Sequence, residues 1–258
     1  MIIKKNFLRN FAGAWIFYTI FPKFPLISPK FKNIAQFAPA LGIIIGSIQC
    51  SIFYILINNS WPILACSSIC ICSGYFITGG LHIDGLMDTF DGLYAGKKKL
   101  LKAMKDSRVG SFGVQAFVVI TLIQLASITK LGSNLLNVLP ICLFWGRFST
   151  LVCIDKFKYL SYKKKSISIS HKNNWKGLKR ESSVSLFCLF LIIIYYLFSI
   201  SSIQGIFTFI IFLIFGLLCS LQIPKIIGNK IGGFNGDSCG ASVVITETTI
   251  LFISAIFL

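Results

Sequence analysis

Two long stretches without any charged residue constrain this chain most strongly. Residues 33–83 and residues 182–224 contain no Lys, Arg, Asp or Glu. A single membrane-spanning helix needs about 20 apolar residues, so each stretch is long enough for two such helices. Turn-forming residues divide both stretches, at 58–62 in the first and at 201–205 in the second. The pattern therefore predicts an all-α, polytopic membrane helix bundle.

Shorter apolar runs bring the predicted number of membrane spans to seven. The predicted spans are residues 34–57, 61–79, 112–129, 135–154, 184–202, 206–223 and 242–258. We expect residues 1–258 to form a single integral membrane domain, because these spans and their connections use up the chain.

Basic residues set the expected orientation of the bundle. Almost all of the 25 Lys and Arg residues fall in the segments 1–32, 81–108, 155–181 and 225–241. Seven spans place these four segments on one face of the membrane, and basic loops are typical of the cytoplasmic face. The sequence therefore predicts a cytoplasmic N-terminus and an external C-terminus.

The charge balance also limits the partners of the chain. Its formal net charge is +17, yet only 13% of its residues are charged and 55% are hydrophobic. Nucleic-acid-binding proteins share the basic charge but not the hydrophobicity, so we expect no nucleic-acid partner. The expected partner is the lipid bilayer, and the sequence carries no signal for an oligomeric state.

Four cytoplasmic segments follow from this topology. They are an interfacial N-terminal segment (1–32) with a helix at 7–21, an Asp-rich loop (80–111), a basic loop (155–181) with lysines at 163–165, and a Gly-rich loop (225–241).

The Asp-rich loop contains a stripe of carboxylates. On a helix, Asp84, Asp88 and Asp91 would lie within about 60° of one another. Two carboxylates ~6 Å apart repel by about 3 kcal/mol at an effective dielectric constant of 20, and a divalent cation would turn this repulsion into attraction. Hard oxygen ligands favour Mg²⁺ or Mn²⁺. The alternative is a solvated acidic helix face, but glycines surround these aspartates in a chain that is poor in acid.

Residues that suit a phosphate follow the aspartates. Lys105 and Arg108 are basic, and Gly110 offers a backbone amide that a phosphate can approach closely. Arg108 is a candidate for bidentate phosphate binding, because the guanidinium group presents several N–H donors in one plane. His82 could act as a base or as a ligand, although a lone histidine is as often structural.

Two further features involve the second half of the chain. Arg147 and Glu247 both fall inside predicted spans, where a charge is costly and usually paired or functional. The partner of Arg147 is then either Glu247 or the substrate. The Gly-rich residues 232–241 form a turn before a helix, and Asp237 with Gly236 would lie on the same membrane face as the Asp stripe.

Several blocks of the sequence resemble the cobalamin synthase (adenosylcobinamide-GDP ribazoletransferase) family. Residues 78–92 (TGGLHIDGLMDTFDG) look like its signature, and residues 104–114 (MKDSRVGSFGV) are similar to its second block. Residues 232–237 (GGFNGD), with Gly240, Ala241 and Glu247, resemble its third block. Residues 18–22 and 39–42 look like its N-terminal pattern, so the resemblance covers nearly the whole chain in order.

The resemblance implies an enzyme of cobalamin biosynthesis in the bacterial inner membrane. Such a transferase joins adenosylcobinamide-GDP to α-ribazole, or to its 5′-phosphate, and releases GMP with Mg²⁺ as the cofactor. The expected metal ligands are Asp84, Asp88, Asp91 and Asp106. The expected phosphate-binding residues are Lys105, Arg108, Gly110 and Gly236. The expected catalytic residues are Asp91 and His82 as candidate bases, and Asp237 as a further metal ligand or as the residue that orients the ribazole hydroxyl.

Two other functions fit parts of the pattern. Membrane phosphotransferases of the CDP-alcohol type also use aspartates and Mg²⁺ at the membrane edge. Their usual Asp-Gly-x-x-Ala-Arg opening is missing here, because Met87 and Asp88 follow residues 84–86 (DGL). A cation-coupled transporter would place its acidic residues near the middle of the bilayer and often contains repeats, and neither feature is visible here.

Overall fold

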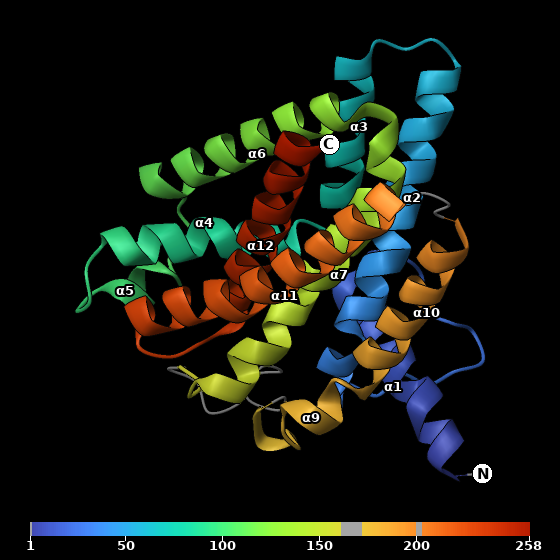
Figure 1. Ribbon diagram of the computed structural model, residues 1–258. Helices are drawn as coiled ribbons and strands as arrows, with labels where there is room; N and C mark the ends of the chain where they lie inside the picture. The colour runs from blue at the N-terminus through green and yellow to red at the C-terminus, as the bar shows by residue number, and fades with distance from the viewer. Residues whose placement is uncertain (1, 161–171, 200–202) are drawn as a thin grey trace.

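The computed structural model describes residues 2–160, 172–199 and 203–258 of the chain (Figure 1). Within these ranges the regular structure is helical, apart from one isolated β-bridge between Tyr159 and Phe234. The predicted all-α fold is therefore confirmed. The lysines at 163–165, which belong to the predicted basic loop (155–181), lie outside the described residues.

The helices follow the apolar runs of the sequence. They are α1 (Ile2–Tyr18), α2 (Ala38–Asn58), α3 (Ile63–Ile77), α4 (Leu81–Tyr94), α5 (Leu100–Ala103), α6 (Ser111–Leu131), α7 (Leu135–Lys156), α9 (Leu178–Glu181), α10 (Ser183–Ser199), α11 (Ile203–Ile231) and α12 (Gly236–Phe257). Short 3₁₀ turns, η1 (Ile34–Phe37) and η2 (Gly132–Asn134), precede α2 and α7.

Several of these helices are long and apolar enough to cross a membrane. In the described part of the chain, the segments that qualify are Ile34–Asn58, Ser111–Lys156, Phe209–Ile231 and Gly236–Phe257. The bent pair of α3 and α4 would add a fifth. Among the described residues, each predicted span lies on a helix. Ser111–Lys156 contains both α6 and α7, and α10 is a shorter apolar helix. The count of seven spans and their orientation stay predictions.

Helix α7 is the centre of the bundle. Every residue from 141 to 154 is buried, which is typical of a helix that neighbours surround on all sides. It packs against α2, α11 and α12 (Figure 1). Outer helices instead expose apolar side chains, such as Val118 and Leu122 on α6 and Phe187 and Phe190 on α10. Exposed apolar faces of this kind suit a lipid environment.

Two glycines turn the chain sharply between α3 and α4. Gly79 and Gly80 adopt left-handed conformations with φ of 58° and 72°, which a side chain would disfavour. The two helix axes meet at 88°. Helix α4 by itself would reach only about 21 Å, less than the hydrocarbon thickness of a bilayer. Since it also carries three aspartates, we treat α4 as lying outside the membrane-spanning segments.

The Gly-rich connection before α12 is shorter than the sequence indicated. Helix α11 continues to Ile231 and α12 begins at Gly236, so only residues 232–235 are left between the two helices. Asn235 caps α12, because its side chain accepts a hydrogen bond from the Ser238 N–H while the Ser238 hydroxyl accepts one from the Asn235 N–H. This capping box places Asp237 in the first turn of α12.

Candidate active site

A close contact between α4 and α12 brings the acidic segments of the chain together. Gly85 on α4 lies against the backbone of Asp237, since a Cβ atom added to this glycine would lie 2.7 Å from the Asp237 carbonyl oxygen. Gly240, one turn further along α12, lies similarly against the backbone of His82. The contact places Asp84 and Asp88 next to Asp237, although the Asp-rich and Gly-rich segments are far apart in sequence.

The carboxylates at this contact interact electrostatically. The pKa of Asp88 is raised from 3.8 to about 7, first by burial and then by the negative charges of Asp237, Asp84 and Asp91. The three aspartates of the predicted stripe lie on one helix, as expected. Ionising all of these groups together is therefore unfavourable unless a positive charge joins them.

The donor set fits a hard divalent cation of the Mg²⁺ type. Within the described ranges, no three His, Cys, Asp or Glu side chains lie close enough together to enclose a metal ion as they stand. Mg²⁺ usually binds to one or two carboxylates and completes its shell with water and substrate phosphates. Asp84 and Asp88 could supply two such carboxylates.

Asp91, the third residue of the stripe, fastens α4 to the start of α6. Its Oδ2 accepts a hydrogen bond of 2.8 Å from the Gly110 N–H, and its Oδ1 accepts one of 2.8 Å from the Gly113 N–H. A Cβ atom on either glycine would lie within 2.6 Å of this carboxylate, so both positions need glycine. Asp91 thus caps α6 from a neighbouring helix. Gly110 uses its N–H in this cap, and the expected roles of both residues toward metal or phosphate stay predictions.

Asp106 and Arg108 pair with each other on the exposed connection before α6. The Arg108 Nε donates to Asp106 Oδ1 at 3.0 Å, and Nη2 donates to Oδ2 at 2.7 Å. These hydrogen bonds lower the pKa of Asp106 to about 2. The structure therefore pairs Asp106 with Arg108, and the roles expected of these two residues toward metal and phosphate stay predictions. Lys105 does lie close enough for its positive charge to act on Asp237.

A cavity of about 210 Å³ opens beside these carboxylates. Asp84 and His82 of α4 line it, as do Gly236 and Asp237 of α12. The His82 ring is buried, and its Nδ1 atom has no hydrogen-bond partner among the described residues. Four of the predicted site residues therefore meet at one cavity.

Other cavity residues were not predicted from the sequence. Tyr18 comes from α1, Thr150 from α7, and Asn235 from the α12 cap. The Asn235 Nδ2 donates a hydrogen bond of 3.0 Å to Asp237 Oδ2, which orients this carboxylate. Tyr18 and Asn235 belong to blocks that carry the family resemblance, whereas Thr150 lies in an apolar run without any local signal.

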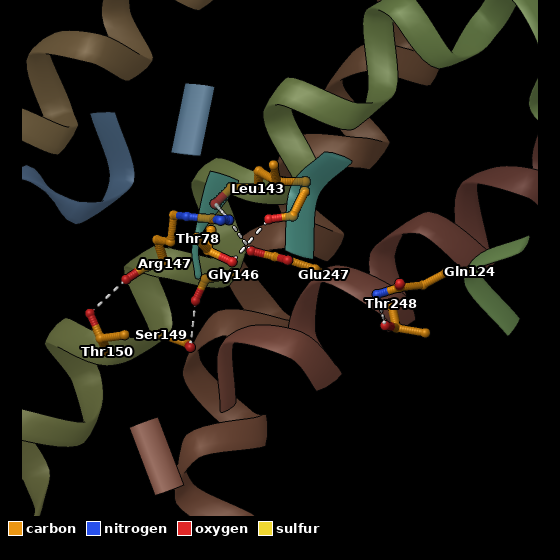
Figure 2. Close-up of polar contacts among 10 residues, drawn as sticks. Thr78, Gln124, Leu143, Gly146, Arg147, Ser149, Thr150, Glu247 and Thr248 are labelled. Atoms are coloured by element: carbon orange, nitrogen blue, oxygen red, sulfur yellow. Dashed lines mark hydrogen bonds and ion pairs between the residues drawn. The ribbon is translucent and has the colours of Figure 1, made fainter. Parts of the chain in front are cut away.

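Arg147 and Glu247 form a buried ion pair between α7 and α12 (Figure 2). The Arg147 Nη1 also donates to the Leu143 carbonyl at 3.2 Å. Of the two partners expected for Arg147, the structure confirms Glu247. The pair lines a second, smaller cavity of about 60 Å³, and His82 lies in the wall of both cavities.

Comparisons with known proteins agree with the family resemblance. The profile of the family described as cobalamin-5-phosphate synthase matches residues 10–255. The chain is 44% identical to an adenosylcobinamide-GDP ribazoletransferase of Prochlorococcus marinus, over 98% of this chain and 97% of the relative. It is 32% identical to a protein of the same name from Thermosynechococcus vestitus, over 96% of both chains. No solved structure matches the chain significantly. The chain therefore belongs to the cobalamin-5-phosphate synthase family.

Proposed function

We propose that this chain is an adenosylcobinamide-GDP ribazoletransferase, which joins adenosylcobinamide-GDP to α-ribazole or its 5′-phosphate in cobalamin biosynthesis. The observation that carries the proposal is the meeting of Asp84, Asp88 and Asp237 at the contact between α4 and α12. It supplies carboxylates beside a cavity in a chain of this family. We place the enzyme in the bacterial inner membrane with this site facing the cytoplasm, because the basic segments flank it.

The reaction is the transfer of a phosphoryl group from one oxygen to another. A ribose hydroxyl of ribazole attacks the phosphorus on the corrinoid side of the pyrophosphate and forms a new P–O bond. The bond between this phosphorus and the bridging oxygen breaks, and GMP leaves with that oxygen. In such reactions, positioning and charge stabilisation supply most of the catalysis.

The proton of the attacking hydroxyl goes to Asp237 in this proposal. Asp237 lines the cavity and is held in orientation by Asn235. Asp91 is less suited to this role, because both of its oxygens already accept backbone hydrogen bonds. Lys105 and the N-terminus of α12 at Gly236 contribute positive charge for the phosphate groups.

Asp84 and Asp88 would hold Mg²⁺ at this site. When bound, the ion would neutralise charge on the pyrophosphate and on the departing GMP. The rest of the site orients the two substrates and receives the proton.

The test is a GMP-release assay on the purified protein in lipid vesicles. Adenosylcobinamide-GDP, α-ribazole and Mg²⁺ should yield GMP and adenosylcobalamin, and a chelator should stop the reaction until Mg²⁺ is restored. Asp88→Asn should abolish GMP release while membrane insertion and the melting temperature stay close to those of the wild type. Full turnover by this variant, or by metal-free enzyme, would contradict the assignment of the site.

A further inference from the structure

We propose that the cavity beside Asp84 and Asp237 binds the heteroaromatic base of the ribazole nucleoside and leaves the corrinoid nucleotide outside it. The inference rests on the proposed function for the identity of the two substrates. It assigns one of them to a particular place in the fold.

The size of the cavity separates the two substrates. Its volume of about 210 Å³ lies below the ~300–1,000 Å³ of pockets that enclose drug-sized ligands. It therefore has room for a bicyclic base and part of a ribose. A corrin macrocycle with its side chains is far larger and has to bind at the open surface near the carboxylates.

The walls of the cavity suit a flat aromatic group. Phe17 and Tyr18 come from α1, and Phe234 comes from the connection before α12. The Tyr18 ring lies 6.3 Å from the ring of His82, measured between ring centroids. Leu81 and Ile154 complete the apolar part. Aromatic walls of this kind favour offset stacking or edge contacts with a planar base.

A benzimidazole needs fewer polar partners in the cavity than a guanine does. A benzimidazole joined to ribose through one nitrogen has a single ring nitrogen left, which accepts one hydrogen bond. Guanine has several donors and acceptors along its edge, and each of them would need a partner among the polar residues of the wall, which include Asp84, Thr150, Asn235 and Asp237.

The position of the cavity also fits the reaction. Asp237, which receives the proton in our proposal, lies in its wall together with Gly236. A nucleoside whose base enters the cavity presents its ribose next to this carboxylate. The ribose hydroxyl then lies between Asp237 and the carboxylates of α4.

Steady-state kinetics of GMP release can test this assignment with each substrate varied in turn. Phe17→Ala should raise KM for α-ribazole roughly tenfold, the size of effect that loss of a stacking aromatic group produces. KM for adenosylcobinamide-GDP should change less than about twofold, since that substrate does not enter the cavity. Ile154→Phe, which fills the cavity, should give the same selective increase. The matched control is Phe11→Ala, because Phe11 lies on the same helix but packs against Trp15, Phe24 and Phe37 instead.

Equilibrium dialysis with labelled α-ribazole alone provides a readout that does not depend on turnover. The wild type should bind it, free GMP should not compete, and the two cavity variants should bind it more weakly than Phe11→Ala. A selective increase in KM for adenosylcobinamide-GDP, or competition by GMP, would assign the cavity to guanine and overturn the inference. GMP release without any effect of the cavity variants would overturn it while leaving the proposed function intact. Ribazole binding without GMP release would refute the proposed function alone.

Discussion

The contact between Gly85 and Asp237 gives the sharpest prediction about catalysis. In Gly85→Ala, the new Cβ would lie 2.7 Å from the Asp237 carbonyl oxygen and 2.9 Å from its Cα. Ordinary van der Waals contact begins at 3.4 Å, so α4 and α12 must move apart by about 0.7 Å. Both atoms belong to the backbone, and no side-chain rotation can relieve the overlap.

The displacement should affect activity more than stability. Overpacking costs about 1–3 kcal/mol, and the better helix propensity of alanine offsets 0.5–1 kcal/mol of that. The free energy of unfolding should therefore fall by about 2.5 kcal/mol or less. A displacement of ~1 Å at an active site can cost 100-fold in rate, so kcat should fall between about tenfold and 100-fold.

The assay combines GMP release with thermal unfolding in the same lipid vesicles. The matched control is Gly92→Ala on the same helix, whose Cβ would meet mainly the flexible side chain of Met104. This control should lose much less activity than Gly85→Ala. If Gly85→Ala keeps more than half of the wild-type kcat, the close packing of α4 on α12 is not what aligns the carboxylates.

Three other predictions concern charges. Asp91→Ala should lower the free energy of unfolding by about 1–2 kcal/mol, because α6 loses its cap. Asp91→Asn should lower it less, and equal losses of the two variants in thermal unfolding would contradict the capping role. Glu247→Ala should cost about 3–5 kcal/mol, because it leaves Arg147 buried without its partner, whereas Arg147→Leu combined with Glu247→Leu should recover much of the loss in the same measurement. Since folding raises the pKa of Asp88 from 3.8 to about 7, its contribution favours the folded state below pH 4 and is lost as the pH rises toward 7. Protons and Mg²⁺ then compete for it, so Mg²⁺ affinity from thermal shifts should fall about tenfold per pH unit below pH 7, and a pH-independent affinity would exclude Asp88 as a ligand.

Local sequence patterns were sufficient to predict the helices and much of the site. A segment that is buried in lipid or in protein lacks charged residues whatever its neighbours are. The charge-free stretches therefore predicted where the helices lie. The spacing of Asp84, Asp88 and Asp91 predicted one face of a helix, and α4 carries all three. The placement of Asp237 near this stripe needed the topology as well.

The partners of individual side chains could not be predicted in the same way. Asp91 and Asp106 look alike in sequence, since both are acidic residues near glycines and basic residues. The structure separates them, because Asp91 reaches the amides of α6 and Asp106 turns to Arg108. Thr150 reaches the cavity only because α7 packs against α12 next to it. Such contacts depend on how helices pack, which residue spacing along one helix does not contain.

The packing also gives the aspartates of one stripe different tasks. The N-terminal amides of α6 balance the negative charge of Asp91, so this residue can stay in place without a metal ion. Its charge still acts on Asp88, one turn away, and contributes to the raised pKa of that residue. Asp88 is thus the carboxylate that gains most from an incoming cation, and Asp84 stands one turn further along as an exposed residue. Asp91 would thus hold one end of the stripe in place, while Asp88 and Asp84 at the other end bind the metal ion. A metal ion and a pyrophosphate could then enter together without disturbing the contact between α4 and α6.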